Sequence, residues 1–131
     1  MQFVESVVYA TDFDESDFMA IKKLIDIIKP FEPTIHCLHI DEQEKISSWD
    51  QMRMYGLKTY FKEVYDYENV EVQIIQAKEV LNGLNEYIKK EQVGLVSLTT
   101  HKRNLITKLF NPSITREFLI HTHIPLLVFH G

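Results

Sequence analysis

Five short apolar runs recur along the chain, at residues 6–10, 34–40, 70–75, 94–98 and 125–129. Each run is about as long as a β-strand and is rich in β-branched, aromatic or leucine residues. Nearly continuous apolar runs such as SVVYA and PLLVF are typical of strands that are buried on both faces. The pattern therefore predicts five strands, several of them inside a covered sheet.

Between these runs, apolar residues recur at the spacing of an amphipathic helix. It predicts helices over about 16–28, 44–67 and 80–88, and a fourth that becomes firm at position 111 or 112. Gly56, in the middle of the second segment, argues against one unbroken helix there. Strands that alternate with helices predict a doubly wound parallel sheet with both faces covered.

Ligands of a doubly wound sheet bind outside the carboxyl ends of its strands, where the strand order reverses. In this chain the loops at that edge are residues 10–14, 40–42, 77–79 and 99–103. Candidate chemistry is therefore sought first in these four loops.

Acidic residues crowd the loop after the first predicted strand, in the sequence ATDFDE. A receiver-type phosphoacceptor domain has acids there to hold Mg²⁺, but it also needs an Asp ending the third strand and a Lys after the last. This sequence has neither. Two interpretations of Asp12 remain open: it contacts a ligand, or the acids of this loop cap the first helix and complement its dipole. Asp14 or Ser16 can provide that cap.

The composition is that of an ordinary globular domain: 131 residues, of which 45% are hydrophobic and 25% charged. A net charge of -5 argues against a nucleic-acid-binding surface. The single cysteine, Cys37, excludes a disulfide framework and a cysteine-based zinc cluster. The sequence shows no basic leader and no apolar run of ~20 residues, so we expect a soluble cytoplasmic protein without a nucleic-acid or membrane partner.

Neither a metal site nor a catalytic site is complete in the sequence. His36 and His39 lie three residues apart on one predicted strand, so their side chains should point to opposite faces and cannot share a metal ion. Since no nearby cysteine or clear acidic partner accompanies the histidines, we expect no metal site. No nucleophile elbow, Walker loop or dinucleotide fingerprint occurs, so we expect no enzymatic activity.

Glycine is scarce, with only 4 residues where ordinary usage of roughly 7% would give about nine. Loops that cradle phosphates usually need glycine, because the backbone must approach the ligand without a Cβ in the way. The most basic segment, residues 99–116, follows the fourth predicted strand, and its Ser113 lies where a helix should begin. Two interpretations remain open: this segment binds an anion, or it is a solvated loop.

The order and spacing of several segments together resemble the universal stress protein (UspA-like) family over essentially the whole chain. VVYATDF resembles its first strand and following loop, TIHCLHIDE its second strand, and SITREFLIHTHIPLLVF its closing helix, turn and last strand. The resemblance implies a single domain over residues 1–131. It also implies a three-layer α/β/α sandwich around a five-stranded parallel sheet of order 3-2-1-4-5, an adenine nucleotide alpha hydrolase-like fold.

ATP-binding members of this family carry the motif G-x2-G-x9-G-[S/T] after the fourth strand. Aligning the closing helix and Pro125 places the three glycines at Thr99, Lys102 and Pro112, so that only Ser113 is retained. Side chains at Thr99 and Lys102 stand where the backbone would wrap the triphosphate, and Pro112 removes a donor amide. The resemblance is therefore to a branch with a degenerate motif, in which ATP binding is lost and no cofactor is expected.

The residues on the adenine side of the family's pocket match this sequence better than the glycine motif does. Asp12 matches the family's first-strand acid, and Ile40 matches an apolar position beside the base. Lys102 can still attract an anion by charge alone. The degenerate site comprises Asp12, Ile40, Thr99, Thr100, Lys102 and Ser113.

Members of the family commonly pair through the last strand. We therefore expect a homodimer whose interface comprises Leu126, Leu127, Val128 and Phe129, an apolar edge that would otherwise be a pairing hazard. The YATDF loop and the degenerate motif also resemble the second half of a tandem member, in which case the partner is a second stress-protein domain.

The function implied is a non-catalytic module in stress response or signalling that acts through dimerisation. The alternative is a regulatory domain that binds an adenine nucleotide or another anion in the residual pocket. An enzyme of the related nucleotide-hydrolysing folds is disfavoured, because no base, nucleophile or metal-carboxylate set is complete.

Overall fold

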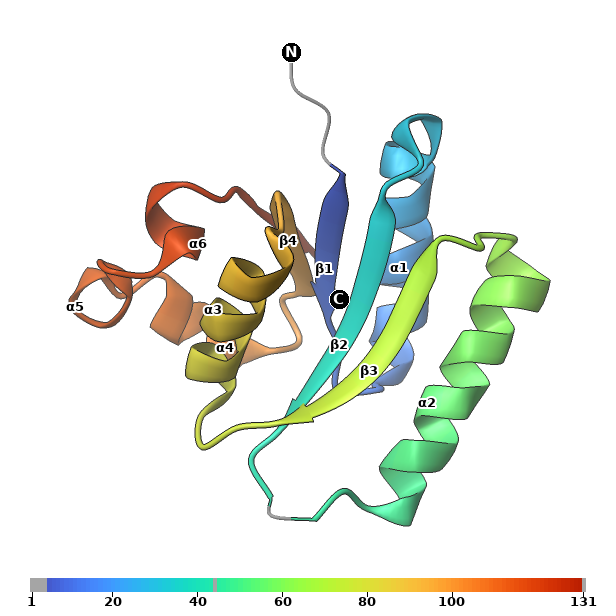
Figure 1. Ribbon diagram of the computed structural model, residues 1–131, viewed down its shortest axis with the longest axis horizontal. Helices are drawn as coiled ribbons and strands as arrows, with labels where there is room; N and C mark the ends of the chain where they lie inside the picture. The colour runs from blue at the N-terminus through green and yellow to red at the C-terminus, as the bar shows by residue number, and fades with distance from the viewer. Residues whose placement is uncertain (1–4, 44, 131) are drawn as a thin grey trace.

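A five-stranded parallel sheet runs through the centre of the molecule, with helices on both of its faces (Figure 1). The computed structural model describes residues 5–43 and 45–130. The strand order is β3-β2-β1-β4-β5 and every neighbouring pair is parallel, which confirms the predicted sheet. The strands are β1 (Ser6–Ala10), β2 (Thr34–Asp41), β3 (Val70–Gln76), β4 (Leu95–Thr99) and β5 (Leu126–Phe129).

The helices form two layers, one on each face of the sheet (Figure 1). One layer consists of α1 (Glu15–Ile28) and α2 (Ser48–Tyr60), and the other is built mainly from α3 (Val80–Glu91) and α4 (Arg103–Leu109). The shorter elements are η1 (Lys29–Phe31), η2 (Phe61–Tyr65), α5 (Pro112–Thr115) and α6 (Leu119–Thr122). The predicted three-layer α/β/α sandwich is therefore confirmed. Within the described ranges, no helix combines the length and the apolar character needed to cross a membrane.

The central strand β1 shows why a nearly continuous apolar run is needed at this position. Val7 and Tyr9 pack into the core beneath α1 and α2, whereas Val8 and Ala10 pack into the core beneath α3 and α4. Side chains alternate between the two faces of a strand, so a strand covered on both faces must be apolar at successive positions. This alternation places the end of β1, and the acidic loop after it, between the two helical layers.

α1 begins at a capping box. The Asp14 carboxylate accepts hydrogen bonds from the Ser16 amide at 3.0 Å and the Ser16 hydroxyl at 2.6 Å. In return, the Asp17 side chain accepts a hydrogen bond from the Asp14 amide at 3.2 Å. Of the two candidate caps in the sequence, Asp14 is therefore the one that the structure uses.

We expect Asp14→Ala to lower the free energy of unfolding by about 1 kcal/mol, the usual cost of removing a carboxylate cap. The hydrogen bonds from Ser16 lower the pKa of Asp14 below its ordinary value of 3.8. The contribution of this carboxylate is therefore present above that value and lost as the pH falls through the lowered pKa. Urea denaturation at pH 7 and pH 3 should show the gap between the two proteins closing in acid. Asp26→Ala, an exposed position on the same helix, is the control and should change stability little.

The segment after α4 differs from the sequence prediction. Apolar spacing predicts one firm helix from about position 112, but the structure has two single turns, α5 and α6. Phe118 between them is extended, with ψ of 142°, so the helical hydrogen-bond ladder stops. The Asn85 carboxamide of α3 then accepts a hydrogen bond from the Leu119 amide at 3.2 Å, which restarts the next turn against α3.

α2, in contrast, runs without a break through Gly56, so the expected interruption does not occur. A glycine inside a helix costs about 1 kcal/mol relative to alanine. Burial of Leu57 and Phe61 in the core beneath the helix offsets that cost, since burying each large apolar side chain contributes about 1.5–3 kcal/mol.

Candidate functional site

A pocket of about 600 Å³ opens at the carboxyl ends of the central strands. It lies where loops after β1, β2 and β4 meet the first turns of α3 and α4, as expected for a doubly wound sheet. Its lining residues are Asp12, Glu42, Val80, Leu81, His101, Lys102, Arg103, Asn104, Leu105 and Lys108. Two of the predicted site residues, Asp12 and Lys102, are therefore brought together here.

Asp12 is held inside the pocket by the protein itself. One carboxylate oxygen accepts a hydrogen bond from the Asp14 amide at 3.3 Å. The other lies 3.1 Å from Nε2 of His101, which is also 3.7 Å from a carboxylate oxygen of Asp14. Asp14 caps the helix, whereas Asp12 lines the pocket. The Asp12 oxygen that could contact a ligand is already in contact with His101. The pairing joins the loops after β1 and β4, 89 residues apart in sequence.

The N-terminus of α3 is also occupied by a side chain of the same chain. The Glu42 carboxylate accepts a hydrogen bond from the Val80 amide at 3.1 Å. A helix N-terminus attracts anions because its first amides are unpaired and its dipole is positive. Glu42 therefore takes the place at α3 that an anionic ligand group would otherwise fill.

The loop after β4 directs its backbone amides toward the protein. The Thr100 amide donates to the Phe129 carbonyl at 2.8 Å, and the Lys102 amide donates to the Thr99 carbonyl at 3.2 Å. Thr99 is fully buried, and its hydroxyl has no hydrogen-bond partner in the described part of the chain. The amides of Thr100 and Lys102 are thus hydrogen-bonded within the chain rather than open to a phosphate.

Ser113 is captured by its neighbour Asn111. The Asn111 side-chain oxygen accepts hydrogen bonds from the Ser113 amide at 3.1 Å and from the Ser113 hydroxyl at 2.7 Å. Pro112 stands at the first position of the short helix α5, where it contributes no amide. The one motif residue that the sequence retains therefore donates both of its hydrogen bonds to Asn111, the N-cap of α5.

Ile40 belongs to the core rather than to the pocket wall. It is 8% exposed and packs against α3, where Gly83 allows a close approach. A Cβ at Gly83 would lie only 3.1 Å from Cγ2 of Ile40.

Asp17 is a buried residue of this site that sequence analysis did not identify. This residue is 2% exposed, and its carboxylate accepts hydrogen bonds from the Tyr9 and Thr11 hydroxyls, both at 2.6 Å. Burial raises the pKa of Asp17, while the hydrogen bonds from Thr11 and Tyr9 act in the opposite direction. Burial, followed by the nearby Asp17 charge, also raises the pKa of Tyr9. The only available sequence signal is that Asp17 stands three residues after the cap Asp14, the capping-box position.

The histidines of β2 diverge as the sequence predicts. His36 contacts the Tyr87 hydroxyl at 2.7 Å in the core beneath α3, and His39 faces Asp50 of α2. Among the described residues, however, one group has the ligand atoms for a metal ion: His39, Asp41 and Asp50. The sequence prediction of no metal site rested on the lack of a nearby cysteine or clear acidic partner for the histidines, and Asp50 is a partner from a different element.

The sequence profile of the universal stress protein family matches residues 4–130. No curated protein sequence matches the chain significantly. Among solved structures, a universal stress protein in complex with cAMP has a TM-score of 0.71 at 12% identity, with 98% of each chain covered. The hypothetical protein MJ0577 has a TM-score of 0.67 at 20% identity, with 99% of this chain and 98% of that chain covered.

A third structural relative is longer. A universal stress protein from Archaeoglobus fulgidus DSM 4304 has a TM-score of 0.68 at 13% identity, and the match covers 96% of this chain but 44% of that one. The structural matches support the fold, and the profile, which covers nearly the whole sequence, gives the family. The chain belongs to the universal stress protein family.

Proposed function

We propose that this protein is a non-catalytic, single-domain module of stress response or signalling in the cytoplasm. In this proposal it acts through dimerisation, and its pocket no longer binds ATP tightly. The observation that carries the proposal is the contact between Asp12 and His101, which occupies the acid expected to face a nucleotide base. Two further internal contacts support it: Glu42 at the N-terminus of α3 and Asn111 on Ser113.

A second candidate function is supported by the charge of the same pocket. Lys102, Arg103 and Lys108 line it, together with His101, against the two acids Asp12 and Glu42. Clustered cations attract phosphates even without a glycine cradle, although with less geometric specificity. One structural relative was solved with a nucleotide, cAMP. An anion-binding regulatory domain is therefore the alternative that the pocket supports.

Titration calorimetry with tripolyphosphate and with adenosine separates these two functions. The non-binding module should give no saturable heat with either compound up to about 1 mM, a binding free energy weaker than about -4 kcal/mol. The anion-binding domain should instead bind tripolyphosphate and not adenosine, and Lys102→Glu should weaken that binding at least tenfold. Lys22→Glu, which makes the same charge change at an exposed position of α1, controls for overall charge.

The free edge of the sheet at β5 supports the proposed dimer. Leu126, Leu127 and Val128 are all partly exposed, whereas the opposite edge strand β3 carries Glu71 and Gln73. Charged and polar residues discourage edge pairing, and an apolar edge invites it. The Pro125 and Phe129 carbonyls point toward β4, so the alternate residues Leu126 and Val128 turn their backbone groups to the open side.

Val128→Pro should therefore convert the dimer to a monomer while leaving the ladder between β4 and β5 intact. Proline removes the outward amide of this residue, and proline is tolerated at such edge positions. Light scattering should give the mass of two chains for the wild type and of one chain for Val128→Pro. Ile74→Pro, which removes an outward amide from the opposite edge, is the matched control and should remain dimeric. A wild-type monomer at high concentration would contradict the homodimer and leave a second stress-protein domain as the proposed partner.

A further inference from the structure

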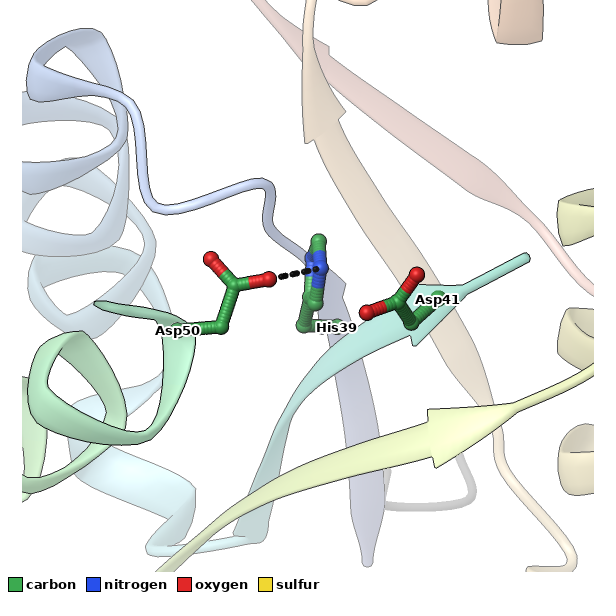
Figure 2. A group of neighbouring side chains, drawn as sticks. All are labelled: His39, Asp41 and Asp50. Carbon is green, nitrogen blue, oxygen red and sulfur yellow. Dashed lines mark ion pairs between the residues drawn. The ribbon is translucent and has the colours of Figure 1, made fainter. Parts of the chain in front are cut away.

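We infer that His39, Asp41 and Asp50 form a binding site for a divalent transition-metal ion. Figure 2 shows the His39 imidazole standing between the two carboxylates. His39 and Asp41 lie two residues apart at the end of β2, so their side chains share one face of the strand. Asp50 comes from the first turn of α2, where Ser47 caps the helix. The three ligand atoms all lie within 4.8 Å of one another.

The orientation of His39 is fixed by a backbone contact. Its Nδ1 lies 2.9 Å from the Thr11 carbonyl oxygen. A carbonyl can only accept a hydrogen bond, so Nδ1 must carry the hydrogen. Nε2 then remains for a second partner, and it faces Oδ2 of Asp50 at 3.5 Å. Metal-bound histidines usually have this arrangement, in which one ring nitrogen donates to a carbonyl or carboxylate and the other binds the ion.

The two carboxylates near Nε2 of His39 favour a cation at this position. With hydrogen on Nδ1, the lone pair of Nε2 faces the Asp50 carboxylate at 3.5 Å, and the ligand oxygen of Asp41 lies within 4.8 Å. A metal ion can bond to all three ligand atoms at once.

Each carboxylate keeps one oxygen for such an ion. Oδ1 of Asp41 accepts a hydrogen bond from the Gln43 amide at 2.9 Å, and Oδ1 of Asp50 lies 3.4 Å from Arg53. These contacts orient the carboxylates, as outer hydrogen bonds do around bound metals. In the described part of the chain, the second oxygen of Asp41 has no hydrogen bond, and that of Asp50 faces His39.

The ligand set and spacing suit zinc and related first-row ions. One imidazole with two carboxylates is a mixed nitrogen and oxygen set of the kind that Zn²⁺ and Mn²⁺ accept. Two ligands about 2.1 Å from Zn²⁺ at a tetrahedral angle lie about 3.4 Å apart. The separation between His39 and Asp50 is 3.5 Å, and the ligand atom of Asp41 lies within 4.8 Å of the other two, so Asp41 must come closer to complete this geometry. Their side chains are 14% and 19% exposed, so the site is shielded while water can still reach a fourth position.

The site is separate from the pocket at the ends of β1 and β4, because none of its three ligands lines that pocket. Phe13, which follows Asp12 in the loop after β1, packs its ring against the His39 imidazole with 4.8 Å between ring centroids. A bound ion would thus connect the end of β2 to the start of α2 without involving Asp12.

Titration calorimetry of the chelator-treated 131-residue chain with ZnCl₂, and separately with MnCl₂, tests the inference. We expect one zinc site with a Kd below about 10 μM, and at least tenfold weaker binding of Mn²⁺, following the usual order of metal affinities. His39→Ala and Asp50→Asn should each lower zinc affinity at least tenfold. Asp50→Asn nearly preserves the side-chain shape, so it remains informative if His39→Ala unfolds. Zinc should also raise the melting temperature of the wild type and not that of Asp50→Asn.

His101→Ala is the control, because His101 makes the other close histidine–carboxylate contact on this edge of the sheet. It should leave zinc affinity unchanged. Two results would overturn the inference: wild-type zinc binding weaker than about 10 μM, which would leave only a proton at Nε2, or affinity that depends on His101 and not on Asp50.

Discussion

Asp17→Ala should lower the free energy of unfolding by about 2–4 kcal/mol. The substitution removes the shared acceptor of two buried hydroxyls, those of Tyr9 and Thr11. Each buried hydroxyl left without a partner costs about 1–3 kcal/mol. It also removes half of the capping box at the start of α1. Urea denaturation at pH 7 measures the change, and a variant within 1 kcal/mol of the wild type would contradict this account of the buried network.

Asp17→Asn provides the matched comparison, since it keeps the shape and one acceptor oxygen. Its stability loss should be smaller than that of Asp17→Ala. Because burial raises the pKa of Asp17, the folded state holds its proton more strongly than the unfolded state. The stability linked to that proton is fully present below the ordinary pKa of 3.8 and is lost as the pH rises through the raised value. The wild type should therefore lose stability relative to Asp17→Asn as the pH rises from 3.8 through the raised pKa of Asp17.

Alanine should have opposite effects at two helical glycines. At Gly83 a Cβ would lie 2.8 Å from Cβ of Ala77, an atom fixed to the backbone, so α3 must move away from the sheet. We expect Gly83→Ala to cost about 1–3 kcal/mol from overpacking, despite the better helix propensity of alanine. At Gly56 no atom lies within 4 Å of an added Cβ, so Gly56→Ala should stabilise by about 0.5–1 kcal/mol.

Thermal and urea denaturation of both variants test this pair. No described glycine has a positive φ, so backbone strain does not enter the comparison. A stabilising Gly83→Ala would contradict the close packing of α3 against Ile40 and Ala77, and a destabilising Gly56→Ala would contradict the open space beside Gly56 in α2. Gly83 matters for the site, because it sets how closely the N-terminal half of α3 approaches the end of β2.

The layers of this fold follow from local patterns in the sequence. All five apolar runs became strands, and α1 and α3 lie where the helical spacing predicts them. Those signals are strong because a strand buried on both faces, such as β1, is apolar at successive positions. The segment after α4 was harder to predict. Its break depends on Asn85 of α3, which caps α6 from 34 residues away.

The candidate site was predictable only in part. The sequence placed Asp12 and Lys102 at the correct edge of the sheet, and the structure brings both into one pocket. It could not show that His101 pairs with Asp12 or that Glu42 caps α3, because those contacts join loops that are distant in the chain. For the proposed metal site, the sequence spacing shows that His39 and Asp41 share one face of a strand. The third ligand, Asp50, lies nine positions after Asp41 on a different element, so sequence spacing alone does not connect it to the other two.

In the proposed function, contacts within the chain occupy the places where ATP would bind. Calorimetric titration of the wild-type protein with ATP and Mg²⁺ is the experiment that decides whether they exclude it. We expect no binding tighter than about 10 μM, a free energy near -7 kcal/mol. Saturable one-to-one binding tighter than that would contradict the claim and show that Asp12 and the loop after β4 can release their internal partners for a nucleotide.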